Sequence, residues 1–274
     1  MKSHLSLWDI AEGRARTILT VDHRIEAPNW YPSGDALLVN GGGRLYRVPL
    51  DRPALEPLDI GIEARCNNDH GISPDGRTIV FSAHRGRGSE MFMMPVTGGT
   101  PLLVTDAAPS WWHGWSPDGR TLAYAAARDD SRVVDLYTMP ASGGPEIRLT
   151  FGDGHSDGPD FSHDGQLIYW NCDRDGHAQI WVMQADGSDQ RKLFADDHVN
   201  WFPHPSPCGT HLVYLAYPPG TQGHPADLPV ALVLCRPDGS DRRRVLDCIG
   251  GQGTMNVPNW APDGRAFAFV HYTP

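Results

Sequence analysis

The sequence predicts an all-β fold, a six-bladed β-propeller whose blades have four strands each. The first observation behind this prediction is a short glycine turn that returns six times, with its glycines 42, 43, 46, 44 and 55 residues apart. Short β-rich runs fill each interval, and a period near 44 residues of this kind is typical of a propeller blade. The second observation is that the two ends of the chain complement each other. The six turns are Pro32-Ser33-Gly34, Pro74-Asp75-Gly76, Pro117-Asp118-Gly119, His163-Asp164-Gly165, Pro207-Cys208-Gly209 and Pro262-Asp263-Gly264.

Each period predicts four strands in a fixed order. The innermost strand precedes the turn, as in 111–115, and the second follows it, as in 121–125. Both runs are apolar and are bounded by Gly, Pro and Asp, which suit tight hairpins, so we expect them to be buried. A more charged outer strand, expected at 102–105, 147–150 and 192–194, would face water. The third strand carries an apolar-aromatic pair at Leu7-Trp8, Leu45-Tyr46, Met91-Phe92, Leu136-Tyr137 and Ile180-Trp181, whereas the fifth copy has Leu232-Val233.

The ends of the chain predict how the last blade is completed. The sixth copy stops after its second strand, 266–272, and so lacks two outer strands. Residues 4–10 and 16–21 look like such a pair without inner strands of their own. We therefore expect the N-terminal strands to close the last blade. The uniform repeat leaves no place for a boundary, which predicts a single propeller domain over residues 1–274.

Composition argues against several functional classes. The chain has 33 acidic and 23 basic residues, a net charge of −10, and its one basic run, Arg242-Arg243-Arg244, lies on an expected outer strand. Nucleic-acid binding needs a concentrated basic face, so no nucleic-acid partner is expected. The five cysteines occur singly without a CxxC pair, which predicts neither a disulfide framework nor a cysteine zinc site. With no secretory or membrane-spanning apolar stretch, we expect a cytoplasmic protein without a membrane span, if Met1 is the native start.

The repeated turn also carries a family resemblance. The runs Trp115-Ser116-Pro117-Asp118-Gly119-Arg120 and Ile72-Ser73-Pro74-Asp75-Gly76-Arg77 resemble the repeat of TolB-type six-bladed propellers, and the resemblance covers essentially the whole chain. It implies a fold and not an activity, because similar repeats occur in TolB, in oligopeptidase propellers and in some pectate-type lyases. The sequence shows neither the extra N-terminal domain and export signal of TolB nor the Gly-x-Ser-x-Gly elbow of serine peptidases. Neither a Tol-system role nor peptidase activity is therefore expected.

The starts of the inner strands are the candidate site, since they converge on the channel of a propeller. One reading is a pocket at the channel mouth that binds a polar ligand or a divalent metal, with Trp111, Trp112 and Trp201 offering flat faces to a sugar. The other reading is that polar residues there simply serve the backbone and channel water. The residues eight positions before the turn glycines are Glu26, Asn68, Trp111, Asp157, Trp201 and Asn256, and close to them lie His70, His113, His155, Asn200 and His204.

The fifth copy contains an eleven-residue extension, 218–228, that accounts for the 55-residue interval. If this loop caps the channel, His224 and Asp227 would join the pocket. Alternatively, it is a solvated insertion, which repeat proteins accept at little cost. The sequence assigns no catalytic residue and no cofactor. It assigns no metal site either, because the spacing Asp153-x-His155-x-Asp157 has no recognised ligand geometry, so a divalent metal stays an option only.

Two functions remain open from the sequence. The first is a non-catalytic module that binds a protein or a small polar ligand through the channel mouth. The alternative is a carbohydrate-active lyase or hydrolase that uses His, Asp or Glu side chains at the same place, with or without a divalent metal. A measurement of divalent-metal content would separate the two.

Overall fold

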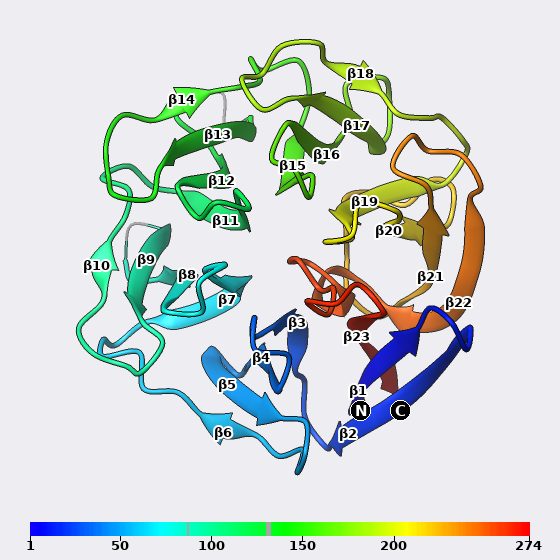
Figure 1. Cartoon of the computed structure of the whole chain (residues 1–274). Helices are drawn as coiled ribbons and strands as arrows, with labels where there is room; N and C mark the ends of the chain where they lie inside the picture. Colours follow the sequence, from blue (N-terminus) through cyan, green and yellow to red (C-terminus); the bar gives the residue numbers. More distant parts are fainter. Residues whose placement is uncertain (87, 130–132) are drawn as a thin grey trace. The chain divides into compact units, whose positions relative to one another are not determined.

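The computed structural model describes residues 1–86, 88–129 and 133–274, which form β-strands with almost no helix (Figure 1). Within these ranges the one helical segment is a single turn, η1 (Gln252–Thr254). The all-β prediction is therefore confirmed. The chain divides into two compact units, one formed by residues 1–112 with 252–274 and the other by residues 113–251. Each unit is described by itself, and the prediction of one domain over the whole chain stays a prediction.

The first unit contains two antiparallel sheets of four strands, each ordered as in the chain. In both sheets the second strand is almost fully buried, as expected for an apolar run behind a tight hairpin. The first sheet consists of β3 (Glu26–Trp30), β4 (Ala36–Gly41), β5 (Arg44–Pro49) and β6 (Glu56–Pro57). The second consists of β7 (Arg65–Ile72), β8 (Thr78–His84), β9 (Ser89–Pro95) and β10 (Leu102–Leu103).

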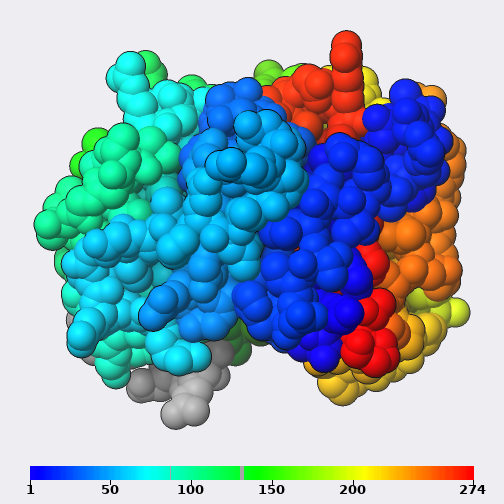
Figure 2. Space-filling view, turned by 90° about the horizontal axis from the view of Figure 1, so that it is seen from below, coloured from blue at the N-terminus to red at the C-terminus, as the bar shows by residue number. Residues whose placement is uncertain are grey.

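The two ends of the chain meet in a third group of paired strands in this unit. β1 (Lys2–Asp9) pairs antiparallel with β2 (Arg14–Val21) on one side and with β23 (Ala266–Thr273) on the other. Figure 2 shows the first and last segments, in blue and red, side by side on the surface. This pairing of the N-terminal strands with the last strand agrees with the sequence, whereas a closed ring of six blades stays a prediction.

The second unit contains three further groups of four strands, again paired in chain order. The apolar-aromatic pairs fall on third strands, as the repeat predicts. The strands are β11 (Ser110–Trp115, beginning just before the unit), β12 (Thr121–Ala126), β13 (Asp135–Pro140), β14 (Ile147–Arg148), β15 (Ser156–Phe161), β16 (Leu167–Cys172), β17 (Gln179–Gln184), β18 (Arg191–Lys192), β19 (Val199–Pro205), β20 (Leu212–Tyr217), β21 (Leu228–Cys235) and β22 (Arg243–Gly250).

Three outer strands are shorter than the sequence suggests. β10, β14 and β18 have two residues each, where runs of three or four were expected. At β14 the reason is local, because the Thr150 hydroxyl accepts the bond from the Leu136 backbone N–H that a longer strand would have taken. The same hydroxyl donates to Asp135. The side chain of Thr150 thus replaces a bond of the strand ladder two residues after β14 ends.

The repeated turn has one hydrogen-bonding scheme in several copies. At Asp118 the carboxylate accepts from the Ser116 hydroxyl at 2.6 Å and from the Arg120 backbone N–H at 3.0 Å. Gly119 has φ +70°, which a residue with a side chain adopts only at a cost. The hydrogen bond from Ser116 lowers the pKa of Asp118. The turn phrase therefore stabilises hairpins and is part of the scaffold.

A β-bulge interrupts the inner strands just after the candidate positions. In β15, Asp157 lies opposite Asn171 and Asp160 opposite Tyr169, so one extra residue is accommodated between them. Because Asn171 and Tyr169 are two residues apart on one face of β16, the bulge brings both aspartates to the same side of β15. The residue after the candidate position has a positive φ in three copies, at Ala27, Gly158 and Phe202.

Candidate ligand-binding site

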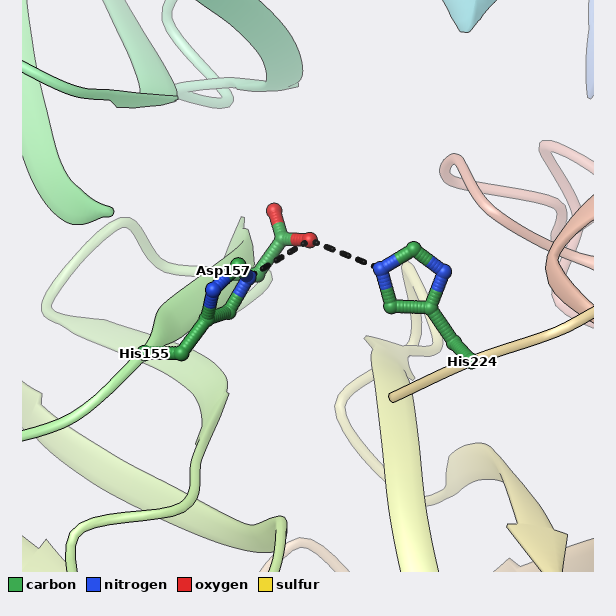
Figure 3. A group of neighbouring side chains, drawn as sticks. All are labelled: His155, Asp157 and His224. Atoms are coloured by element: carbon green, nitrogen blue, oxygen red, sulfur yellow. Dashed lines mark ion pairs between the residues drawn. The ribbon is translucent and has the colours of Figure 1, made fainter. Parts of the chain in front are cut away.

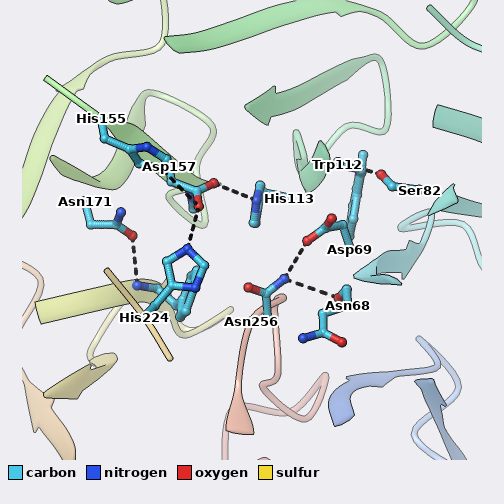
Figure 4. A network of polar contacts seen from close by, with 12 residues as sticks. Asn68, Asp69, Ser82, Trp112, His113, His155, Asp157, Asn171, His224 and Asn256 are labelled. Carbon is cyan, nitrogen blue, oxygen red and sulfur yellow. Dashed lines mark hydrogen bonds and ion pairs between the residues drawn. The ribbon is translucent and has the colours of Figure 1, made fainter. Parts of the chain in front are cut away.

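Three imidazoles surround the carboxylate of Asp157 within the second unit (Figures 3 and 4). His113 comes from β11, His155 directly precedes β15, Asp157 lies on β15, and His224 comes from the loop between β20 and β21. Residues far apart in the sequence are thus brought together by three separate groups of strands. We call His113, His155, Asp157 and His224 the Asp157 cluster.

The two oxygens of the Asp157 carboxylate have different neighbours. Oδ1 lies 2.9 Å from Nε2 of His113 and accepts a hydrogen bond from the Gly158 backbone N–H at 2.8 Å. Oδ2 lies 3.8 Å from Nε2 of His155 and 3.8 Å from Nε2 of His224. Oδ1 is therefore used to hold the carboxylate in place, while Oδ2 points toward the two half-buried imidazoles.

Two aromatic side chains form the wall behind these imidazoles. The ring of Trp201 meets His224 edge-on at 4.5 Å and His155 at 5.9 Å between centroids. Phe202 stacks on His113 at 6.4 Å and meets His224 at 5.4 Å. Trp201 is only 3% exposed, so its face packs against protein. The expectation that Trp201 offers a flat face to a sugar is therefore wrong, and so is the same expectation for Trp112, which is 1% exposed.

The backbone around the cluster is held by a buried amide. Oδ1 of Asn171 accepts a hydrogen bond from the Phe202 backbone N–H at 3.0 Å. Phe202 has φ +54°, and a bulky residue in this region costs roughly 1–3 kcal/mol unless its surroundings enforce it. A Cβ on Gly158 would come within 2.8 Å of the same Asn171 oxygen. Asn171 and Gly158 therefore allow the two bulged strands to approach each other.

The long loop brings His224 into the cluster. The Tyr217 hydroxyl donates to the Pro225 carbonyl at 3.1 Å, and a Cβ on Gly251 would lie 2.3 Å from that carbonyl oxygen. The loop is thus packed against its own unit around His224, while the interpretation that it caps a channel stays a prediction. Asp227, which that interpretation also placed in the pocket, is exposed.

Mutual proximity shifts the pKa values of the cluster in different directions. Burial disfavours the Asp157 carboxylate, but the His113 and His155 imidazoles overcome it and hold the pKa of Asp157 well below its usual value. Burial also opposes protonation of His155, yet the Asp157 carboxylate 3.8 Å away attracts the imidazolium and raises the pKa of His155. Burial dominates at His224 and lowers its pKa. The cluster therefore combines an ionised carboxylate with two imidazoles of different basicity.

Four other predicted residues form a network in the first unit. The Asn40 amide donates to Oδ1 of Asn68 at 2.9 Å, and its oxygen lies 3.2 Å from Nε2 of His70. Glu26 approaches the same amide at 3.5 Å. Complete burial lowers the pKa of His70 to about 3, so this imidazole is neutral at physiological pH.

Asn256 joins the first-unit network from the last part of the chain. Its amide donates to the Asp69 carboxylate at 2.7 Å and to the Asn68 carbonyl at 3.3 Å (Figure 4). Both asparagines are buried. These side chains bond mainly to one another, which favours a structural role over binding of a ligand.

The remaining predicted residues lie outside both groups. His204 is buried, with Nδ1 3.0 Å from the Asp160 carboxylate. The Asn200 amide donates to Asp196 at 3.0 Å. Trp111 is half-buried in the first unit. Of the twelve predicted residues, the structure therefore brings His113, His155, Asp157, Trp201 and His224 together.

The comparisons with known proteins identify the family. The family model of the TolB β-propeller domain matches residues 105–227. A curated, uncharacterised protein of Agrobacterium fabrum is 45% identical over 276 residues, covering 100% of this chain and 94% of the relative. A solved structure from Agrobacterium tumefaciens, provisionally named TolB, is 44% identical with a TM-score of 0.97, covering 100% of this chain and 99% of that one.

A more distant structure supports the fold. TolB from Acinetobacter baumannii is 19% identical with a TM-score of 0.69, covering 91% of this chain and 64% of that one. Within the described residues, no helix is long and apolar enough to cross a membrane. Sequence relationship and structural similarity agree, and the chain belongs to the TolB-like β-propeller family.

Proposed function

We propose that this chain is a closed six-bladed propeller that acts as a non-catalytic binding module for a small polyhydroxylated ligand, such as a sugar, at the Asp157 cluster. The observation that carries the proposal is the convergence of His155 and His224 on the Oδ2 side of a buried, ionised carboxylate. A hydroxyl group matches this arrangement because it can donate to Oδ2 and accept from an imidazole N–H at once.

The exposure of the cluster favours a small molecule over a protein partner. The side chains of His155 and His224 are 38% and 24% exposed, whereas that of Asp157 is 12% exposed. A ligand must therefore enter between the two imidazoles to reach the carboxylate. Small-molecule sites place such recessed polar groups in an apolar setting, and here the buried rings of Trp201 and Phe202 pack behind the imidazoles.

The ionisation of Asp157 favours binding over catalysis. A general base works best when its pKa lies near the working pH. The pKa of Asp157 lies well below the usual range of an aspartate, because the His113 and His155 imidazoles outweigh its burial. The carboxylate is therefore a good hydrogen-bond acceptor and a poor proton acceptor.

The test is a titration of the histidine NMR signals with a panel of neutral sugars and sugar acids. A ligand at this site should shift the signals of His155 and His224 and leave that of His198, which lies outside the Asp157 cluster, unchanged. His224→Gln should weaken the affinity at least tenfold, since it removes one of the two imidazoles that face Oδ2 of Asp157, while His198→Gln serves as the matched control. Equal affinity in both variants would place the ligand elsewhere.

A second candidate is a carbohydrate lyase or hydrolase, favoured by the opposite pKa shifts of His155 and His224. Two neighbouring groups whose pKa values are pushed apart are a common acid and base assignment, with His155 as the acid and His224 as the base. Incubation with oligosaccharides followed by product analysis tests this candidate. Products that form with the parent chain and not with His224→Gln would favour the enzyme.

A further inference from the structure

We propose that His155, Asp157 and His224 bind one divalent transition-metal ion, best matched by Zn²⁺, and that His113 is the residue that positions the carboxylate. The inference rests on the proposed function in one respect, because the metal and the polar ligand would share the Asp157 cluster. It adds the chemistry that recognises the ligand, since a bound metal with an open position attracts hydroxyl and carboxylate oxygens.

The distances are close to those of a metal site. One ligand atom from each of the three residues lies within 4.8 Å of the other two, and Oδ2 of Asp157 is 3.8 Å from each Nε2 (Figure 3). Ligands about 2.0–2.1 Å from a tetrahedral zinc ion are roughly 3.3 Å apart. The two distances from Asp157 would therefore have to contract by about 0.5 Å, and the distance between the two imidazoles by up to about 1.5 Å. Rotation of the half-buried His155 and His224 side chains would supply these shifts.

The donor set selects the class of metal. Two imidazoles and one carboxylate suit zinc and other late first-row ions, whereas magnesium and calcium prefer sites made of oxygen atoms. Three protein ligands are also the number found in zinc sites that keep a position open for water or substrate. The exposed sides of His155 and His224 leave room for that fourth ligand.

The surroundings of Asp157 resemble the support that metal ligands need. Oδ1 is occupied by His113 and by the Gly158 backbone N–H, so Oδ2 is directed at the two imidazoles. Hydrogen-bonded partners of this kind orient ligating carboxylates and tune their affinity for the metal. The backbone of His155 is fixed as well, because its N–H donates to the Asp173 carboxylate at 2.7 Å.

The imidazole of His155 gives a further indication of a metal site. Its Nε2 atom is buried and has no hydrogen-bond partner among the described residues, and its nearest charged neighbour is Oδ2 of Asp157 at 3.8 Å. A buried polar atom without a hydrogen bond is costly and calls for an explanation. A metal ion between the three ligand atoms would use the free electron pair of this nitrogen.

The experiment is isothermal titration of the full chain with ZnCl₂ after treatment with EDTA, followed by the same titration with MgCl₂. We expect one zinc per chain and no magnesium binding under the same conditions. Asp157→Asn and His224→Gln should each lower the zinc affinity at least 100-fold. His113→Gln should lower it 10–100-fold, as expected for a residue that orients a ligand.

Two variants guard against adventitious zinc. Cys208→Ser removes an exposed thiol that contacts the Thr210 hydroxyl beside His211, and His198→Gln removes an imidazole of the same unit that is 44% exposed. Both variants should bind zinc like the parent chain. Circular dichroism shows whether each variant is folded. Zinc binding that persists in Asp157→Asn and His224→Gln, or that disappears with Cys208→Ser, overturns the proposal.

The experiments distinguish failure of the zinc site from failure of the proposed polar-ligand site. A sugar that shifts the signals of His155 and His224 in the presence of EDTA, together with no zinc binding, overturns the metal site and leaves the ligand site. One zinc per chain that depends on His224, together with no response to any polar ligand, confirms the metal site and overturns the proposed function.

Discussion

Asp157 and Asp160 lie three residues apart on β15 and have similar first partners, but their environments differ. Asp157 lies 2.9 Å from His113 and Asp160 lies 3.0 Å from His204, and all four side chains are largely buried. Burial alone raises the pKa of a carboxylate. It prevails at Asp160, whose pKa is raised, whereas the pKa of Asp157 is held well below its usual value by neighbouring imidazoles.

The difference comes from what other segments add to each aspartate. The bulge in β15 places both carboxylates on the same side of the strand, so the strand itself does not distinguish them. His155, just before β15, and His224, from the long loop, approach Asp157 within 3.8 Å. Asp160 has His204 as its one hydrogen-bonded imidazole among the described residues. A buried His–Asp pair is thus structural at one position and part of a candidate site at the other.

The largest loss in the free energy of unfolding is expected for His204→Ala. This change leaves the buried Asp160 without its imidazole, and the removal of one partner of a buried pair typically costs about 3–5 kcal/mol. His113→Ala should cost about 1–2 kcal/mol, because Asp157 keeps the Gly158 N–H and two further imidazoles nearby. Urea denaturation measures both. If His113→Ala is the more destabilising of the two, the assignment of roles is reversed.

The stability contributions of Asp157 and Asp160 should change with pH in opposite directions. The folded pKa of Asp157 is depressed, so its contribution to stability is present above pH 4 and is lost as the pH falls through the folded value. The folded pKa of Asp160 is raised, so the folded state holds its proton more tightly, and its contribution is lost as the pH rises from about 4 through the folded value.

The variants Asp157→Asn and Asp160→Asn turn this difference into a measurement. Stability at neutral pH minus stability at pH 3 should shrink in Asp157→Asn and grow in Asp160→Asn. A single titrating group changes the slope by at most about 1.4 kcal/mol per pH unit. Urea midpoints at several pH values, with the parent chain as reference, provide the data. Shifts of the same sign in both variants would contradict the comparison.

The sequence predicts the scaffold much better than the site. The turn glycines and the apolar-aromatic pairs lead to the correct strands, because each copy repeats the same local chemistry, and the unmatched strands at the two ends lead to the pairing of β1 with β23. To predict the site, one would also have to know the pairing registers of several different strands. The count of eight residues before each glycine finds Asp157, but it cannot show that a bulge follows, nor that Phe202 adopts a positive φ there.

The histidines show the same limit. His70 and His204 occupy sequence positions similar to that of His113, and all three are buried, yet their partners are Asn40, Asp160 and Asp157 respectively. No local pattern distinguishes them, because the partner of each imidazole depends on the neighbouring strands. His224 could be found only as a residue of an unusually long loop, which is a signal of insertion and not of chemistry.

The smallest effects are expected at the turn carboxylates, a third environment for aspartate in this chain. Asp118 is exposed and accepts from Ser116 and from the Arg120 N–H, so Asp118→Ala should lower the melting temperature by about 1–3 °C without changing zinc or sugar binding. Differential scanning calorimetry measures the change. Loss of binding at an unchanged melting temperature would mean that the turn belongs to the site.

The fifth copy offers the reverse experiment, because Cys208 stands where the other turns have Asp or Ser. Its thiol lies 3.3 Å from the Ser206 hydroxyl, and sulfur accepts hydrogen bonds only weakly. Cys208→Asp restores the acceptor that Ser116 uses at Asp118, so the melting temperature should rise by about 1–2 °C, with zinc binding unchanged. Cys208→Ala, which removes the weak acceptor without a replacement, is the control and should not raise it. A gain in Cys208→Ala equal to that in Cys208→Asp would show that the carboxylate is not what stabilises these turns.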